Sequence, residues 1–239
     1  MIRADQPTIF GSAVIAAISS KADGNMKFGI ASDADAEKNR REFLRSAGLD
    51  IARTTLVGIT YDTDDFAKYR MVAEGEKGAG MLAGTEVLHA DALVTDRPGH
   101  ALFLPLADCV GVILYDPSRG ILMVSHVGRH SVEIDGARRS VKYLADQFGT
   151  NPAELKIWLS PGVGKATYPL HRFGGKSLQE VIISQLKMAG VLEENIEKSD
   201  IDTAASENYY SHSEYLKGND DHGRFAIVAE MRVQGEPAA

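Results

Sequence analysis

Short apolar runs and single amphipathic helices alternate along the chain. The runs are rich in Val, Ile, Leu and aromatic residues and are bounded by Gly, Pro, Asn and Asp, which is typical of strands. We expect strands at residues 8–20, 27–31, 53–61, 68–73, 91–95, 101–106, 110–115, 121–125, 156–159, 201–203 and 223–229. Because strands outnumber helices and tight turns join several of them, the pattern favours an α+β fold with mixed or antiparallel sheets over a doubly wound parallel sheet.

Apolar spacing and end signals predict three helices, at residues 34–47, 136–148 and 176–189. Ser32 supplies an N-cap for the first helix and Gly48 a stop. Residues 74–84 contain four glycines, and we expect them to form a surface flap. Residues 208–222 are polar and aromatic, which predicts an ordered loop.

Composition narrows the class of protein. The 239 residues are 44% hydrophobic and 25% charged, which are ordinary values for one globular domain over residues 1–239. The net charge of −7 gives no electrostatic basis for nucleic-acid binding, and no apolar run approaches the ~20 residues of a membrane span. The single cysteine excludes an internal disulfide and favours a reducing compartment. We therefore expect a cytoplasmic protein without nucleic-acid or membrane partners, either a monomer or a homodimer.

Candidate chemistry gathers around the only cysteine, Cys109. It precedes the apolar run 110–115, which a turn at residues 116–120 joins to the run 121–125. If Tyr115 faces Gly120 across this hairpin, Cys109 lies directly opposite His126 on the same face, with Cβ atoms about 5 Å apart. A thiol and an imidazole so placed could share a metal ion or a proton. The alternative is a small buried hydrophobic cysteine and a histidine that merely ends a strand.

The central motifs resemble those of a known family. Asp91-Ala-Leu-Val-Thr95, Ala107-Asp-Cys109 and His126-Val-Gly128 are similar, in order and spacing, to the DALVT…TADC…HAGWRG core of the multicopper polyphenol oxidase (laccase-domain) family. Members of that family are also described as purine nucleoside phosphorylases and as peptidoglycan-editing factors.

The resemblance continues outside the core and spans nearly the whole chain. Glu37-Lys-Asn-Arg40 is similar to the eNR helix of the family, and residues 160–164 resemble its GPxIG loop. Tyr210-Ser-His212 followed by Gly223-Arg-Phe225 resembles its closing FSxRR…GR segment.

The resemblance implies an α-β-β-α sandwich and a zinc ion, or copper in some members. The ligands would be the histidine of a QVHG motif, the cysteine of ADC and the histidine of HAG. In this chain the last two are Cys109 and His126. Thiolate and imidazole suit zinc, and three protein ligands leave a fourth position for water or substrate.

The chain departs from the family pattern at the first ligand. The segment that corresponds to QVHG is Ile59-Thr-Tyr61-Asp62, so Tyr61 replaces the histidine, and HAGWRG becomes His126-Val-Gly-Arg129-His130. Positions near 165–167, often cysteines in the family, are not cysteines here. The missing ligand could come from Asp62, His89, His100 or His130; otherwise the metal binds more weakly or has been lost.

The function implied by the resemblance is a purine nucleoside enzyme that phosphorolyses or deaminates adenosine-like substrates, with or without zinc. Cys109 and His126 would carry the chemistry, and Asp108 could orient His126 or a water. Arg40 and Arg129 are candidate phosphate clamps because guanidinium groups are permanently charged bidentate donors.

Further candidates for binding the nucleoside or phosphate are Asn39, His130 and Tyr61. Each polar candidate also has a purely structural interpretation. Asn39 and Arg40 would be solvent-facing helix residues, Arg129 a surface arginine, and Asp108 an aspartate at a strand end.

Two other functions stay open. The first is a metal-free cysteine hydrolase in which Cys109 is the nucleophile and His126 the base, assisted by Asp108 or the amides of residues 160–164. The second is a degenerate family member that acts as an interaction protein. Multicopper laccase chemistry is not expected, because the seven scattered histidines lack the HxH pairs that several copper ions need.

Overall fold

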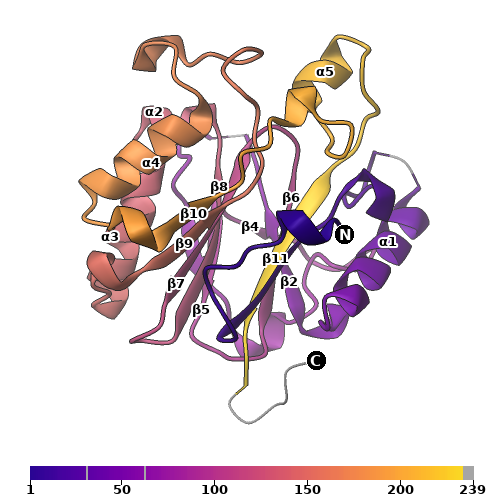
Figure 1. Ribbon diagram of the computed structural model, residues 1–239. Helices are drawn as coiled ribbons and strands as arrows, with labels where there is room; N and C mark the ends of the chain where they lie inside the picture. The colour runs from indigo at the N-terminus through magenta and orange to yellow at the C-terminus, as the bar shows by residue number, and fades with distance from the viewer. Residues whose placement is uncertain (31, 62, 234–239) are drawn as a thin grey trace.

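Two β-sheets face each other, and helices cover the outer face of each (Figure 1). The computed structural model describes residues 1–30, 32–61 and 63–233. The five-stranded sheet has the order β1 (Val14–Ile18), β11 (Phe225–Met231), β6 (Ala101–Leu106), β2 (Thr54–Gly58) and β4 (Leu88–His89). In it β1, β11 and β6 are antiparallel neighbours, whereas β6, β2 and β4 run parallel.

The second sheet has six strands and is also mixed. Its order is β10 (Ile196–Lys198), β9 (Lys156–Leu159), β7 (Val110–Asp116), β8 (Ile121–Val127), β5 (Ala92–Thr95) and β3 (Tyr69–Met71). The four central strands are antiparallel, and each edge strand pairs in parallel with its neighbour. The expectation of mixed sheets is confirmed.

The alternation of side chains along single strands explains the layers. In β6, Leu102 and Leu104 point into the core between the sheets, whereas Phe103 points outward and packs on Phe43 and Leu44 of α1 (Asp33–Ser46). Because both faces of such strands are buried, their sequences are continuous apolar runs.

The outer face of the six-stranded sheet has its own cover. It packs against α3 (Gly136–Phe148) and α4 (Leu178–Met188), next to the short helix α2 (Arg129–Glu133). The predicted α-β-β-α sandwich is therefore confirmed (Figure 1). Among the described residues, no helix combines the length and the apolarity needed to cross a membrane.

The register of the β7–β8 hairpin differs from the predicted one by two positions. Tyr115 pairs with Leu122 and Gly111 with His126, because the turn closes between Asp116 and Ile121 instead of between Tyr115 and Gly120. The carboxylate of Asp116 accepts hydrogen bonds from the backbone N–H groups of Ser118 and Arg119, which stabilises the turn in this position. A shift of two keeps every side chain on its predicted face, because the period of a strand is two.

Several predicted elements are wrong in extent or kind. The first strand begins only at Val14, after a turn, and pairs with β11; residues 27–30 form loop and turn, and Ala31 lies outside the described residues. Residues 201–203 form no strand, since Asp202 makes only an isolated bridge with Gly162. The expected loop 208–222 contains the helix α5 (His212–Leu216), capped by Ser211.

The glycine-rich segment 74–84 is not a free flap. Met81 is completely buried, and backbone hydrogen bonds join Ala79 to Leu56 and Gly78 to Thr54 along β2. Small residues here permit close packing of backbone on backbone, which the glycine spacing alone does not distinguish from mobility.

Candidate functional site

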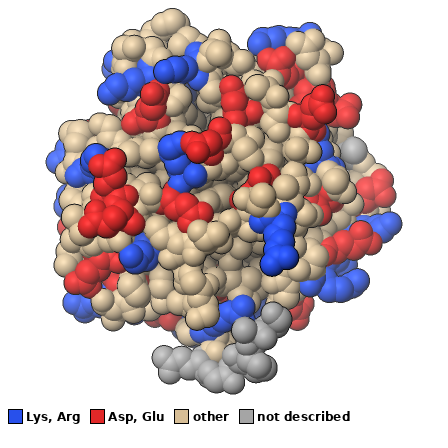
Figure 2. All heavy atoms as spheres, in the orientation of Figure 1, with Lys and Arg blue, Asp and Glu red and all other residues tan. Residues whose placement is uncertain are grey.

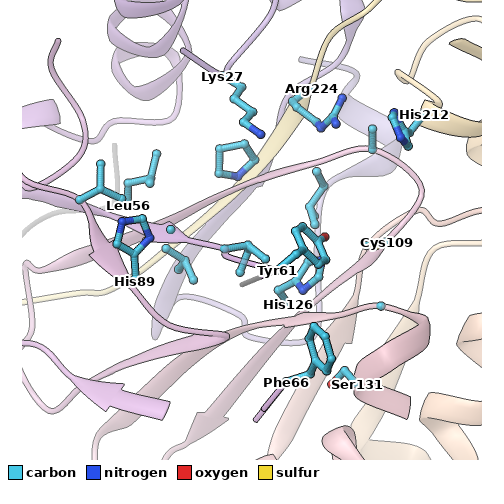
Figure 3. Close-up of a pocket in the computed structure, with 18 of the residues that line it drawn as sticks. Lys27, Leu56, Tyr61, Phe66, His89, Cys109, His126, Ser131, His212 and Arg224 are labelled. Carbon is cyan, nitrogen blue, oxygen red and sulfur yellow. The ribbon is translucent and has the colours of Figure 1, made fainter. Parts of the chain in front are cut away.

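A cavity of about 720 Å³ opens where the ends of β2, β6 and β8 meet the start of β7. Six of the residues predicted for the site line it: Tyr61, Cys109, His126, Arg129, His130 and Arg40. Segments far apart in the sequence contribute to its wall, from Lys27 to Arg224 (Figure 3). Sequence motifs that lie as far apart as those of Arg40 and Arg224 are thus brought to one place.

Cys109 and His126 meet beside a glycine. Cys109 immediately precedes β7, and His126 lies in β8, fixed by its backbone N–H donating to the carbonyl of Asp91 at 2.8 Å. A Cβ placed on Gly128 would lie 2.9 Å from the Sγ of Cys109 and 3.3 Å from Cε1 of His126. The thiol and the imidazole therefore both border the space that the missing side chain of Gly128 leaves.

Both groups are neutral at physiological pH. Burial, with a smaller contribution from the charge of Asp108, raises the pKa of Cys109 to about 12. Burial lowers the pKa of His126 to about 4. The pair therefore presents a thiol and an uncharged imidazole, which can donate and accept hydrogen bonds but carry no charge.

The described part of the cavity wall carries cations and no carboxylates. Lys27, Arg40, Arg129 and Arg224 line it, and no Asp or Glu of the described chain does. Burial lowers the pKa of Arg224, and burial together with the charge of Arg224 lowers that of Lys27. The face of the molecule in Figure 2, in contrast, intersperses acidic and basic side chains. In a chain of net charge −7, this local excess of positive charge favours a bound anion.

Arg40 is not the solvent-facing residue that its place in the helix suggested. It is 1% exposed, and its guanidinium lies 3.9 Å from the ring centroid of Phe28. Its Nε donates to the carbonyl of Met26, and its Nη1 donates to the carbonyls of Gly80 and Met81. Arg40 thus ties α1 to the glycine-rich segment while its charge contributes to the cavity.

Two predicted site residues lie outside the cavity lining. The Oδ1 of Asp108 accepts the hydroxyl of Thr203 at 2.7 Å, and its Oδ2 accepts the backbone N–H of Ser213 at 2.6 Å. The side chain of Asn39 donates to the carbonyl of Asn25 at 3.0 Å. Both side chains bind other segments of the chain instead of facing the cavity.

Aromatic rings form the end of the cavity that lies opposite Lys27 and Arg224. Phe66 stacks on His130 with ring centroids 4.7 Å apart and an interplanar angle of 18°, and Tyr61 lies 6.4 Å from Phe66. Arg129 contacts His130 with 3.3 Å between Nη2 and Nε2. In Figure 3, Lys27 and Arg224 lie at one end, Phe66 at the other, and Tyr61 and His126 between them.

The described donors do not complete a metal site. Cys109 and His126 are suitable ligands for zinc, but no group of three His, Cys, Asp or Glu residues in the described ranges could hold a metal ion. Of the predicted replacements for the missing histidine, His89 and His130 line the cavity. His100 instead lies buried against Thr55, with 2.8 Å between Nε2 and Oγ1, and Asp62 lies outside the described residues.

Sequence reasoning did not single out Lys27, Arg224 and His212, which also line the cavity. Arg224 and His212 belong to the two motifs at the end of the chain that resemble the family's closing segment, so a signal for them was present. Lys27 lies in a loop without any motif, and only the fold brings it to the cavity.

Several curated proteins are similar to this chain in sequence. Among curated relatives, a purine nucleoside phosphorylase of Bacteroides thetaiotaomicron is 29% identical over 136 residues, covering 56% of this chain and 50% of the relative. The purine nucleoside phosphorylase YlmD of Bacillus subtilis is 27% identical over 137 residues, covering 57% and 48%. The chain thus spans about half the length of the curated relatives it matches.

Solved structures match over a greater length. YlmD from Geobacillus stearothermophilus has a TM-score of 0.84 at 20% identity and covers 95% of this chain and 94% of its own. The protein YfiH of Bacillus licheniformis has a TM-score of 0.81 at 22% identity, covering 92% and 93%. These likenesses show the fold. The family model described as multi-copper polyphenol oxidoreductase laccase matches residues 18–232, and the chain belongs to that family.

Proposed function

We propose that the chain is an enzyme that phosphorolyses purine nucleosides in this cavity. The observation that carries the proposal is the placement of Lys27 and Arg224 in a wall to which no described carboxylate contributes, where burial lowers the pKa of both groups. Inorganic phosphate is the anion that such a site fits. The volume of about 720 Å³ lies in the ordinary range for small-molecule sites. The names of the curated relatives support the same reaction.

The two ends of the cavity suit the two substrates. Phosphate would lie between Lys27 and Arg224, and the purine would stack near Phe66 and His130. The ribose would then lie between the phosphate and the purine, beside His126 and Tyr61 (Figure 3). The neutral imidazole of His126 and the thiol of Cys109 would hydrogen-bond to the nucleoside and fix its position.

The reaction follows from this arrangement. A phosphate oxygen forms a bond to C1′ of the ribose while the bond from C1′ to purine N9 breaks, and the bonding electron pair leaves with the purine, which takes up a proton. The ribosyl centre becomes positively charged in the transition state, and the phosphate held opposite it stabilises that charge. Because the described donors do not complete a zinc site, we assign no step to a metal.

The alternative of a cysteine hydrolase has less support. A nucleophilic cysteine acts as its thiolate, and burial at Cys109 disfavours the thiolate by raising the pKa to about 12.

Hydrolytic deamination of the nucleoside also has less support. This reaction needs no phosphate, and it would leave the cationic end of the cavity without a role.

Purine release from inosine and adenosine, with and without phosphate, tests the proposal. We expect turnover that requires phosphate and is insensitive to a chelator. Lys27→Met and Arg224→Met should each raise the KM for phosphate by about 10-fold or more. Lys38→Met and Arg138→Met, at exposed positions on α1 and α3, serve as matched controls. Phosphate-independent turnover, or an unchanged KM for phosphate in both cavity variants, would contradict phosphorolysis at this site.

A further inference from the structure

His212 lines the cavity with a nitrogen that has no hydrogen-bond partner. It is the first residue of α5, and its Nδ1 is buried without a partner among the described residues. Its ring stacks on Tyr215, which in turn stacks on His222 with centroids 4.2 Å apart. Neither of these ring contacts uses a nitrogen of His212.

The burial of Nδ1 determines which nitrogen is the donor. A buried N–H without an acceptor is costly, whereas an unprotonated nitrogen there loses less. The neutral ring therefore keeps its proton on Nε2, and Nε2–H is the donor available to a ligand in the cavity. Figure 3 shows His212 and Arg224 at the same end of the cavity.

The carboxylate of Asp108 fixes the position of this histidine. Its Oδ2 accepts the backbone N–H of Ser213, the residue after His212, at 2.6 Å. Its Oδ1 accepts the hydroxyl of Thr203 at 2.7 Å. The residue that precedes Cys109 is thus joined directly to the start of α5, so the thiol and His212 share one anchor.

The backbone conformation of Asp108 is also unusual. Its φ is 74°, and Asp135 is the only other non-glycine residue of the described chain with a positive φ. Asp and Asn adopt this left-handed region more readily than other side chains, and glycine adopts it freely. The position therefore requires both a permissive backbone and a side chain that accepts a hydrogen bond from Ser213.

We propose that His212 is a substrate-contacting residue that donates a hydrogen bond from Nε2 to phosphate, and that Asp108 is a positioning residue that holds it there. The inference rests on the proposed phosphorolysis. It gives Asp108 a role through His212, in place of the expected role of orienting His126 or a water.

Substitutions at Asp108 separate the effect of its backbone conformation from that of its side-chain hydrogen bonds. Asp108→Gly keeps the backbone conformation and removes both acceptors. Asp108→Asn also removes the charge, but its carbonyl oxygen can accept from Ser213 and its amide can donate to the hydroxyl of Thr203. Asp135→Gly is the matched control, because it removes an exposed aspartate at the other positive φ.

We expect Asp108→Gly to raise the KM for phosphate by about 10-fold, and Asp108→Asn to recover most of that loss. His212→Phe, which keeps a ring for stacking on Tyr215, should match Asp108→Gly. The double variant Asp108→Gly/His212→Phe should be no worse than either single variant, because both remove the same contact. Circular dichroism and thermal unfolding identify any variant that does not fold.

Calorimetric binding of inorganic phosphate and of inosine to each folded variant provides a readout independent of turnover. If Asp108→Asn is as impaired as Asp108→Gly, or if the two single losses add in the double variant, the positioning role is overturned while phosphorolysis stands. A wild-type protein that neither binds phosphate nor cleaves inosine overturns both proposals.

Discussion

Gly111 pairs with His126 across the β7–β8 hairpin. The register therefore places Cys109 beside the end of β8, where the missing side chain of Gly128 leaves room for the thiol and the imidazole. A mutation that fills this space should affect the site more than the fold.

Gly128→Ala should lower kcat/KM by about 10²-fold, because the new Cβ would lie 2.9 Å from the Sγ of Cys109 and displace it or His126. Its φ of −108° is accessible to alanine, so the backbone is not strained. Gly75→Ala is the control, since a Cβ there meets nothing within 4 Å. Steady-state kinetics on both variants measure the effect, and full activity of Gly128→Ala would show that the thiol and imidazole need not adjoin.

Cys109 should react slowly with alkylating reagents. With its pKa raised to about 12, the thiolate fraction at pH 8 is on the order of 10⁻⁴. Because Cys109 is the only cysteine, the rate of iodoacetamide labelling, followed by mass spectrometry, reports on this group alone. The same chain unfolded in guanidinium is the control and should react far faster. Rapid labelling of the folded protein would instead favour the cysteine hydrolase.

Arg40→Ala should destabilise the protein by roughly 2–5 kcal/mol, because it empties a buried volume and leaves the carbonyls of Met26, Gly80 and Met81 without their donor. Arg41→Ala removes only an exposed ion pair with Glu37 and should cost less than about 1 kcal/mol. Urea unfolding compares the two variants. An Arg40→Ala protein of wild-type stability with a raised KM for phosphate would restore the phosphate-clamp interpretation of this residue.

The free energy of unfolding should fall as the pH decreases from 6.5 to about 4, partly because of His100. Burial lowers the pKa of His100 to about 4 in the folded state, while the unfolded chain takes up the proton near pH 6.5. Protonation therefore favours the unfolded state within this window, by at most about 3 kcal/mol from this residue. His126 should add to the same slope.

Chemical denaturation at several pH values measures this slope. His100→Gln should flatten it, whereas His171→Gln, at an exposed histidine, should leave it unchanged. A slope that is the same in all three proteins would show that His100 is not buried in its neutral form.

The sequence pattern determined the α+β class and most of the elements, and the resemblance to the family supplied the layers. Strands such as β6 and β9 and the helix α3 have the predicted bounds, because a helix or a buried strand imposes its own period on nearby residues. The motifs around Cys109 and His126 likewise identified two residues that line the cavity. The prediction of which face of the hairpin each side chain occupies was correct although the register is shifted by two, because the face depends only on the alternation of side chains along a strand.

Only the tertiary structure decided what each polar side chain contacts. The burial of Arg40 follows from Phe28, in the loop before the helix, and from the segment near Gly80, which lies 40 residues farther along the chain. The cationic end of the cavity combines Lys27 from an early loop with Arg224 near the start of β11. The local pattern of residues cannot predict such contacts, because they form only when segments distant in the chain become neighbours in the folded protein.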